Sequence, residues 1–306
     1  MKPTTFYIGI DGGGTKCRAR LRAASASGVT GDGPLLGEGV GGSANIRLGL
    51  DLIWTHILDA IDGALAQAHL TRAIFSDTSI GLGLAGITTA ADCERTIAAG
   101  PRFAFANAAT DAHAACLGAF SGRDGAIMIT GTGSAGYAWV GGRGYAVGGW
   151  GFEVNDDASA AVLGREAIRA ALHGFDGLAP HTAFTRAVMA HFGGHPSDVV
   201  KWVTSARPGD YGTLAPMIMS HAADGDLIAV GIVERAAQDL GKYLARLNEL
   251  GAPQICLVGG MADVLTPWLA PWTRSVLAVP EHDAIEGAIL LAHGASNGMA
   301  VEAVMS

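Results

Sequence analysis

The sequence is poor in cysteine and in charge, and it has no long apolar run. Its four cysteines, at positions 17, 93, 116 and 256, match no zinc or iron–sulfur spacing, which indicates reduced thiols in an intracellular protein. No segment reaches the ~18 apolar residues of a membrane-spanning helix. Residues 1–5 lead straight into a strand pattern without signal-peptide character. We therefore expect a cytoplasmic protein with no membrane partner.

Basic residues are scarcer than acidic ones, with 20 Lys and Arg against 28 Asp and Glu and a net charge of −8. This balance argues against a nucleic-acid partner, because binding a phosphate backbone requires clustered positive charge. Arg18, Arg20 and Arg22 alternate along one predicted strand, and we interpret them as a solvated face. A hydrophobic content of 49% with only 16% charged residues predicts large buried cores, and 306 residues are enough for two domains.

Glycine is abundant, with 45 residues, and three of them are consecutive in the most informative segment. An apolar strand pattern at 6–10 is followed by a turn and a second strand pattern. The turn reads Asp11-Gly12-Gly13-Gly14-Thr15-Lys16. Glycines allow positive φ and close approach of the backbone, and successive N–H groups in such a turn bind anionic oxygens. We expect the turn to bind a nucleotide phosphate and its aspartate to hold Mg²⁺ through water. A plain hairpin turn is the alternative.

Neither common phosphate motif fits this turn. A Walker A loop ends in Gly-Lys-Ser/Thr before a helix, whereas here the threonine precedes the lysine and a strand follows. The dinucleotide pattern Gly-x-Gly-x-x-Gly fails because Cys17 replaces its third glycine. A second copy of the device supports phosphate binding, since residues 126–140 again give an apolar strand, a turn with Thr132 and Gly133, and another strand. Two such hairpins favour two lobes that bind one nucleotide.

Strand and helix patterns alternate along the chain. Strand patterns cover residues 6–10, 17–21, 79–84, 103–106, 126–130, 136–140, 255–258 and 276–279. Helical patterns cover residues 46–68, 159–173, 181–191, 198–205, 226–249 and 284–293. This alternation predicts an α/β protein with partly parallel sheets. Small residues cluster at 117–124, where we expect the domain boundary, and we predict no repeat besides the two hairpins.

One carboxylate lies where a catalytic base would be useful. Asp111 follows a strand that we expect to end near Ala106, and it opens a helix. Aspartate is among the best N-cap residues, and capping is the commoner role at such a position. The carboxyl end of a strand is also where open α/β sheets bind ligands, and a base there could accept the proton of an attacking hydroxyl. Both interpretations stand on position alone.

Three further loops contain residues that suit ligands. Asn45 precedes a helical pattern, so its amide either caps the helix or binds sugar hydroxyls. A glycine-rich loop around Trp150, followed by Asp156, offers an apolar wall and a bidentate acceptor, as sugar sites do. The paired Gly259 and Gly260 end a strand, where a base or ribose could approach the backbone, although a simple turn explains them equally well.

Together these motifs resemble the actin/Hsp70/sugar-kinase superfamily, and within it the N-acetylglucosamine kinase family, in particular its bacterial glucosamine kinases. The resemblance runs nearly end to end, and its specificity comes from the order and spacing of short motifs. These are the phosphate loops at 11–15 and 129–134, the sugar loops at 42–46 and 148–156, the base segment Thr110-Asp111, the adenosine loop at 257–260 and the segment 283–288 that opens the closing helix.

The resemblance implies a fold, a reaction and a set of site residues. The fold would be two ribonuclease-H-like lobes with an interlobe cleft: a small lobe at 1–117, joined by the C-terminal helix near 290–306, and a larger lobe at 118–289. The reaction would be ATP-dependent, Mg²⁺-dependent phosphorylation of the 6-hydroxyl of glucosamine, with Asp111 as base, by a homodimer. Implied ATP residues are Asp11, Gly12, Gly13, Gly14, Thr15, Lys16, Thr132, Gly133, Gly259 and Gly260. Implied sugar residues are Ser43, Asn45, Asp111, Ser134, Ala135, Gly149, Trp150, Gly151 and Asp156.

The chain departs from the family pattern after the second sugar loop. Asp157 and Ala158 stand where the family often has Gln or Glu followed by Gly. The extra carboxylate suits a cationic 2-amino group, so we favour glucosamine over N-acetylglucosamine. A non-catalytic ATP-dependent sugar sensor is a second hypothesis. A third is an iron–sulfur activator ATPase, which the scattered cysteines do not favour.

Overall fold

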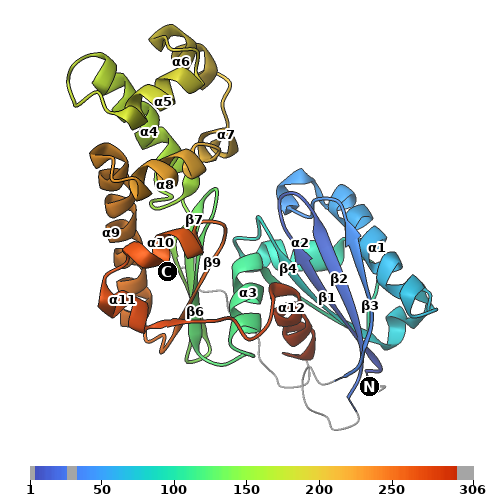
Figure 1. The fold of residues 1–306 in the computed structure, drawn as a ribbon. Coiled ribbons are helices and arrows are strands. Elements are labelled where there is room, and N and C mark those ends of the chain that lie inside the picture. The colour runs from blue at the N-terminus through green and yellow to red at the C-terminus, as the bar shows by residue number, and fades with distance from the viewer. Residues whose placement is uncertain (1–3, 26–32, 295–306) are drawn as a thin grey trace. The chain divides into compact units, whose positions relative to one another are not determined.

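The structure is a computed structural model that describes residues 4–25 and 33–294 (Figure 1). Within these residues it contains two five-stranded sheets, ordered β3-β2-β1-β4-β5 and β10-β9-β6-β7-β8. Counted from its other edge, the second sheet runs β8-β7-β6-β9-β10, which is the strand order of the first. The α/β class and the two ribonuclease-H-like lobes are thus confirmed. The shared strand order is a topological repeat that leaves no sequence period, so the sequence shows no repeat besides the hairpins.

The first sheet combines a β-meander with parallel crossovers. β1 pairs antiparallel with β2 and parallel with β4, β2 pairs antiparallel with β3, and β4 pairs parallel with β5. The strands are β1 (Phe6–Gly12), β2 (Cys17–Ala23), β3 (Leu35–Gly41), β4 (Thr78–Leu84) and β5 (Phe105–Thr110). The accompanying helices are η1 (Ile46–Leu48), α1 (Leu50–Gln67), η2 (Arg72–Asp77), α2 (Ala90–Ala98), α3 (Asp111–Ala119) and α12 (Ala284–His293).

Side-chain size decides which helix lies on which face of this sheet. Ile8 and Ile10 of β1 are fully buried and belong to one apolar cluster with residues of α1. The alternate position is Gly9, where a Cβ would lie 2.5 Å from the backbone oxygen of Ile285. Gly81 of β4 likewise allows the backbone of α12 to approach. Large aliphatic residues therefore pack against α1, and glycines allow α12 to pack closely on the other face.

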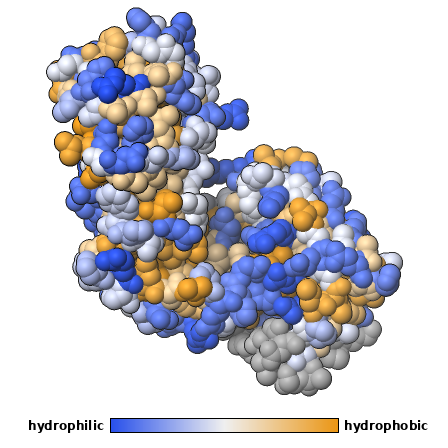
Figure 2. All heavy atoms as spheres, viewed as in Figure 1, coloured by the Kyte–Doolittle hydropathy of each residue, from blue (hydrophilic) through white to orange (hydrophobic). Residues whose placement is uncertain are grey.

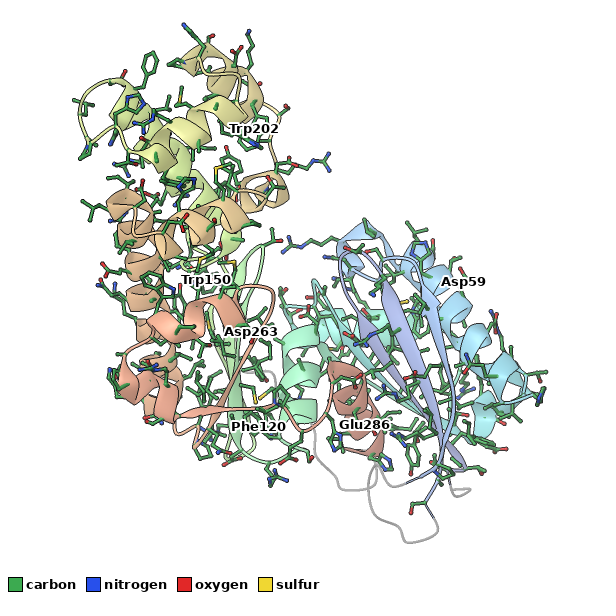
Figure 3. The ribbon with its side chains drawn as sticks, viewed as in Figure 1. Asp59, Phe120, Trp150, Trp202, Asp263 and Glu286 are labelled. Carbon is green, nitrogen blue, oxygen red and sulfur yellow. The ribbon has the colours of Figure 1, made fainter. Side chains whose placement is uncertain are left out.

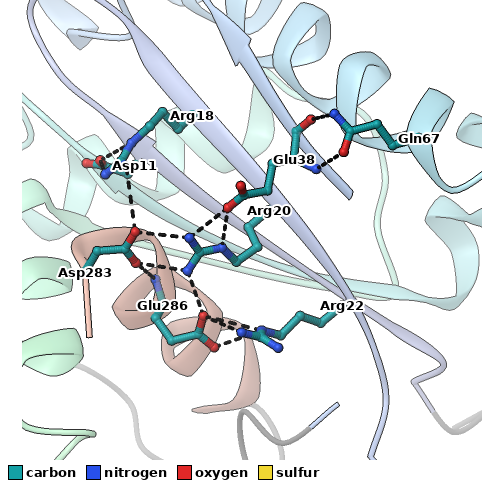
Figure 4. A network of polar contacts seen from close by, with 8 residues as sticks. All are labelled: Asp11, Arg18, Arg20, Arg22, Glu38, Gln67, Asp283 and Glu286. Carbon is teal, nitrogen blue, oxygen red and sulfur yellow. Dashed lines mark hydrogen bonds and ion pairs between the residues drawn. The ribbon is translucent and has the colours of Figure 1, made fainter. Parts of the chain in front are cut away.

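The face covered by α12 is also the face that carries the three arginines of β2, since Gly9 pairs with Arg20 in the register. The side chains of Arg18, Arg20 and Arg22 are 39%, 16% and 22% exposed, and carboxylates surround them (Figure 4). The prediction of a solvated face is wrong. The reason is that α12, which follows more than 250 residues later, supplies acidic partners that no local pattern shows.

The second sheet is built from β6 (Gly125–Thr130), β7 (Ser134–Val140), β8 (Arg143–Gly148), β9 (Ile255–Val258) and β10 (Leu277–Ala278). Its helices are α4 (Ala160–Phe175), α5 (Ala183–His191), α6 (Pro196–Val203), α7 (Pro208–Gly212), α8 (Ala215–Ala223), α9 (Leu227–Glu249), α10 (Ala262–Leu265), η3 (Thr266–Trp268) and α11 (Pro271–Ser275).

Two compact units share the chain. The first unit comprises residues 1–127, 137–145 and 279–306, and the second comprises 128–136 and 146–278. This partition differs from the expected lobes at 1–117 and 118–289, because residues 137–145, from within β7 to within β8, and the whole of α12 are grouped with the first sheet. The described part of the expected closing segment ends at residue 294, and residues 295–306 lie outside the described residues.

The predicted elements agree with the structure wherever side-chain periodicity is strong. The prediction of a helix at 284–293 is confirmed by α12, whereas β3, β8, α2 and α8 were not predicted. β5 ends at Thr110 rather than near Ala106. Among the described residues no helix is long and apolar enough to cross a membrane. On the face shown in Figure 2, hydrophobic residues are interspersed with hydrophilic ones in both units.

Candidate functional site

The first glycine turn joins β1 to β2 and presents its backbone to solvent. The N–H of Gly13 donates to the oxygen of Lys16 at 3.0 Å, and Gly14, Thr15 and Lys16 are exposed. None of the three glycines adopts a left-handed φ, so the turn does not use the freedom of positive φ that glycine allows. The absence of a Cβ is what matters in this turn, and it matters at Gly12. A Cβ on Gly12 would lie 2.5 Å from Leu84, whereas a Cβ on Gly14 would meet nothing within 4 Å.

The predicted first sugar loop is attached to this turn. The N–H of Ala44 and the hydroxyl of Ser43 both donate to the oxygen of Gly13, at 3.1 and 3.2 Å. Asn45 accepts from the N–H of Arg47 at 3.0 Å and so caps η1, which confirms the capping interpretation for its oxygen. No hydrogen bond within the described part of the chain uses its Nδ2. Ser43 and Asn45 therefore lie beside the first glycine turn.

Asp111 lies at the same edge of the first sheet as this turn. The registers align Gly12 with Leu84 and Leu84 with Thr110, so β1, β4 and β5 end at one level. The N-cap of α3 is Thr110, whose hydroxyl accepts from the N–H of His113 at 3.0 Å. The capping interpretation of Asp111 is therefore wrong. Its carboxylate opens α3, at the carboxyl edge where open α/β sheets bind ligands.

The environment of Asp111 suits a general base. Burial raises the pKa of its carboxyl above the usual 3.8, a hydrogen bond from the N–H of Ala112 at 2.8 Å opposes the rise, and the charge of Asp11 adds to it. A carboxylate with a raised pKa accepts a proton more readily than an exposed one.

The second glycine turn is held by the N-terminus of α4. The N–H of Gly131 donates to the oxygen of Gly133 at 2.9 Å, which closes the turn. The N–H groups of Ala160 and Ala161 donate to the oxygens of Gly131 and Thr132, at 2.8 and 3.3 Å. These bonds fix the carbonyl groups of the turn. The side chain of Thr132 is exposed.

The predicted adenosine loop packs on the same turn. Gly259 has φ +105°, and a Cβ there would lie 2.3 Å from the oxygen of Thr130. The N–H of Met261 donates to that oxygen at 3.0 Å, and a Cβ on Gly260 would meet nothing within 4 Å. Gly259 is therefore required by close packing, whereas Gly260 presents open backbone beside the second glycine turn.

The second sugar loop is shaped by three left-handed glycines. Gly148, Gly149 and Gly151 have φ of 74°, 76° and 98°, and Trp150 between them is 64% exposed (Figure 3). A Cβ on Gly149 would lie 3.1 Å from the Cβ of Ala135, which places those two predicted sugar residues in contact.

Asp156 connects this loop to the second phosphate turn. Its Oδ1 accepts from the N–H of Gly151 at 3.2 Å, and its Oδ2 lies 2.7 Å from the position of a Cβ on Gly133. Burial is the largest cause that raises its pKa, the N–H groups of Gly151 and Ser134 oppose the rise, and the charges of Glu153 and Asp157 add to it. Gly133, predicted to bind ATP, thus lies beside Gly151 and Asp156, predicted to bind the sugar.

Ser134 has a supporting role in this arrangement. It is 4% exposed, and its hydroxyl donates to the backbone oxygen of Asp157 at 2.7 Å. The residue after Asp157 is Ala158, which has φ +63°, a conformation in which a side chain is strained. Its oxygen accepts from the hydroxyl of Thr130 at 2.7 Å, which holds it there. The sequence departure at Ala158 therefore occupies a position where glycine would be relaxed.

The predicted residues fall into two groups, each brought together within its own unit. Asp11, Gly12, Gly13, Gly14, Thr15, Lys16, Ser43, Asn45 and Asp111 belong to the first unit. Thr132, Gly133, Ser134, Ala135, Gly149, Trp150, Gly151, Asp156, Gly259 and Gly260 belong to the second.

Comparison with known proteins agrees with this geometry. The family model described as the BadF/BadG/BcrA/BcrD ATPase family matches residues 8–292, a range that contains both glycine turns and Asp111. The chain belongs to the BadF/BadG/BcrA/BcrD ATPase family.

Individual relatives cover most of the chain. It is 40% identical over 287 residues to glucosamine kinase GspK of Vibrio cholerae, which spans 94% of this chain and 95% of the relative. It is 28% identical over 244 residues to an N-acetylmuramic acid/N-acetylglucosamine kinase of Clostridium acetobutylicum, over 77% and 76% of the two chains. A Chromobacterium violaceum protein provisionally described as an N-acetylglucosamine kinase has a similar crystal structure, with a TM-score of 0.81, 34% identity and coverage of 94% and 99%.

Membership of an ATPase family makes ATP the nucleotide, and the phosphates of ATP are commonly bound together with a divalent cation. Within the described residues no group of three or more His, Cys, Asp or Glu side chains could enclose a metal ion. Both contacts of Asp11 with Arg18, at 2.7 and 3.2 Å, use Oδ2, so Oδ1 could hold an ion through water, as a hydrated Mg²⁺ requires.

Two residues of this ATPase were missed as parts of the site. Arg18 was interpreted as solvated, although its position seven residues after Asp11, across a two-strand hairpin, places the pair in register. Tyr243 of α9 donates to Asn155 at 2.9 Å and to Asp157 at 3.2 Å, and so supports the second sugar loop. No sequence signal identifies Tyr243, because it lies almost 90 residues beyond that loop.

Proposed function

We propose that this ATPase-family protein transfers the γ-phosphoryl group of ATP to the 6-hydroxyl of glucosamine, giving glucosamine 6-phosphate and ADP. The observation that carries the proposal is the placement of Asp111. Its partly buried carboxylate shares a sheet edge with the phosphate turn and is not used as a helix cap. The name of the relative with 40% identity supports the choice of reaction.

In the proposed reaction each residue has one task. The amides of the exposed turn residues Gly14, Thr15 and Lys16 would bind phosphate oxygens. The carboxylate of Asp111 would take the proton of the sugar's 6-hydroxyl. The oxygen of that hydroxyl would form a bond to the γ-phosphorus as the bond between this phosphorus and the β,γ-bridging oxygen breaks. Asp11 would hold Mg²⁺ through water, and the ion would supply charge neutralisation at the phosphates.

The choice of glucosamine rests on the charge around the second sugar loop. Glu153, Asp156 and Asp157 lie close enough for the first and third to raise the pKa of the second. A cationic 2-amino group gains from this negative field, whereas the neutral acetamido group of N-acetylglucosamine does not. Tyr243 holds Asp157 by a hydrogen bond and so keeps its charge in place.

A coupled assay of ADP release with a panel of amino sugars tests the proposal. We expect kcat/KM for glucosamine to exceed that for N-acetylglucosamine. The reverse order would replace the substrate with the acetylated sugar and leave the kinase chemistry standing. ATP hydrolysis that no sugar accelerates would reject the kinase and favour the sensor hypothesis.

The iron–sulfur activator remains the hypothesis to separate by a direct measurement. Cys17, Cys116 and Cys256 are each 0% exposed, so none of the three presents a thiolate for a cluster shared between subunits. We expect the anaerobically purified protein to be colourless, and visible absorption of an iron–sulfur cluster would contradict this expectation.

We propose a cytoplasmic homodimer, for which light scattering of the purified protein gives the mass.

A further inference from the structure

Arg18 lies between two carboxylates of different origin. Its Nε and Nη2 contact Oδ2 of Asp11 at 3.2 and 2.7 Å, and its Nη1 lies 3.6 Å from Oδ2 of Asp283 (Figure 4). Asp11 belongs to the phosphate turn, and Asp283 is the N-cap of α12. The two partners are unequal, since Arg18 makes two hydrogen bonds to one oxygen of Asp11 and only a longer contact with Asp283.

Asp283 is prepared to accept more positive charge. Its oxygens already accept from Nη1 and Nη2 of Arg20 at 3.0 and 3.1 Å, and its Oδ1 accepts from the N–H of Glu286 at 3.1 Å. It remains 37% exposed, so its side chain has room to approach Arg18. Arg20 in turn contacts Glu38 and Glu286 and does not depend on Asp283 alone.

We propose that Arg18 is the resident counter-cation of Asp11 and that it exchanges Asp11 for Asp283 when a magnesium-bound nucleotide reaches the phosphate turn. Before binding, the guanidinium cancels a negative charge that would repel phosphates. When the metal ion supplies positive charge at Asp11, the guanidinium is redundant there and competes with the ion. Asp283, 3.6 Å away, is the acceptor that receives it. This inference rests on the proposed function only in requiring that the turn binds a nucleotide.

The exchange predicts opposite effects for two substitutions. Arg18→Gln leaves Asp11 uncompensated, so it weakens binding of metal-free ADP and has little effect on Mg-ADP, where the ion replaces the arginine. Asp283→Asn removes the second acceptor and keeps Arg18 on Asp11, so it weakens Mg-ADP binding and leaves metal-free ADP unchanged. Asparagine is also a good N-cap, so α12 keeps its start. The dissociation constant for metal-free ADP divided by that for Mg-ADP therefore rises in Arg18→Gln and falls in Asp283→Asn.

Isothermal titration with ADP, in EDTA and in Mg²⁺, measures this ratio for each variant. We expect shifts of at least about five-fold in opposite directions, the lower end of the coupling between linked sites. Arg22→Gln is the matched control, because Arg22 contacts Glu286 and the oxygen of Gly33 but not Asp11 or Asp283. It should lower the melting temperature and leave the ratio unchanged. Arg18→Lys keeps the charge and should restore metal-free binding to within about two-fold of wild type.

Each outcome decides one question. Ratios within about two-fold of wild type for both Arg18→Gln and Asp283→Asn, or shifts in the same direction, overturn the exchange. If Asp283→Asn is unstable, the pair Arg18→Gln and Arg18→Lys still decides whether Arg18 acts by its charge. A wild-type protein that binds no ADP in Mg²⁺ rejects the proposed function as well, whereas normal binding with unchanged ratios rejects only the exchange.

Discussion

The hydroxyl of Thr110 caps α3 and leaves the carboxylate of its neighbour Asp111 without a capping role. The two residues can therefore be separated by substitution. Asp111→Asn should reduce turnover by roughly 10²–10⁴-fold, because the proposed base is lost, while the KM for sugar changes little. Thr110→Ala should cost about 1 kcal/mol of unfolding free energy through loss of the cap. Steady-state kinetics and urea denaturation measure the two effects, and an Asp111→Asn enzyme within a few-fold of wild type would return Asp111 to a structural role.

The raised pKa of Asp111 predicts a gain in stability on the loss of its charge. A carboxyl whose pKa is higher in the folded than in the unfolded protein favours folding below its usual pKa of 3.8, and this contribution disappears as pH rises through the folded value. Asp111→Asn should consequently melt at a higher temperature than wild type at pH 7, and the difference should shrink in acid. Calorimetry from pH 4 to pH 8 measures it. A variant less stable than wild type at pH 7 would contradict the burial of a charge there.

The catalytic rate should follow the same group in the opposite sense. A base must be ionised, so kcat/KM should fall as pH drops through the pKa of Asp111, which lies above its usual value. The variants Asp111→Asn and wild type should differ most at neutral pH and least on the acid side. If the residual activity of Asp111→Asn fell at low pH in the same way as that of wild type, the fall would be due to the titration of another group.

The first glycine turn offers a matched pair of substitutions. A Cβ on Gly12 would lie 2.5 Å from Leu84 and 2.9 Å from Ala44, so Gly12→Ala should cost roughly 1–3 kcal/mol of stability. A Cβ on Gly14 meets nothing within 4 Å, so Gly14→Ala should leave the melting temperature unchanged. If phosphate approaches this backbone, Gly14→Ala should still raise the Kd for ATP about ten-fold, the equivalent of one good hydrogen bond. Unchanged ATP binding would place the phosphates elsewhere.

The buried carboxylate of Glu286 should be a major stabilising group of the first unit. It is 7% exposed and contacts Arg20 and Arg22 at 2.9 to 3.0 Å (Figure 4). Glu286→Gln leaves two half-buried cations less compensated and should cost roughly 2–4 kcal/mol, discounted for their partial exposure. Asp62→Asn is the control, because the Asp62–Arg72 pair is about half exposed and should contribute less than ~1 kcal/mol. Equal effects in urea denaturation would show that burial does not distinguish the pairs.

The sequence predicted the parts of the site in which local chemistry decides the structure. Both glycine turns and Asp111 at a strand end follow from strand–turn patterns that act over a few residues, whereas the contact of Asp156 with Gly133 joins two separate loops and was not predicted. β3 was not predicted because its inward positions Gly37, Gly39 and Gly41 contain no apolar alternation. A Cβ at each would lie 1.9 to 2.2 Å from a backbone oxygen of α1, so close packing rather than hydrophobicity selected them.

Long-range contacts explain the remaining errors. The arginines of β2 look solvated until α12 brings Asp283 and Glu286 against them. Asp111 looks like a cap until the extent of β5 assigns the N-cap of α3 to Thr110. In each case the deciding partner or boundary depends on the packing of the whole sheet, which no window of sequence contains.

The most direct measurement is the identity of the product formed from ATP and glucosamine by wild type and by Asp111→Asn. Phosphorus–proton coupling in the NMR spectrum of the product shows which oxygen carries the phosphate. We predict coupling to the two protons on C6 for wild type, with ADP formed in equal amount, and product formation slowed by at least about 100-fold in the variant. Phosphate on another oxygen, or equal product from both proteins, would contradict phosphoryl transfer to the 6-hydroxyl with Asp111 as base.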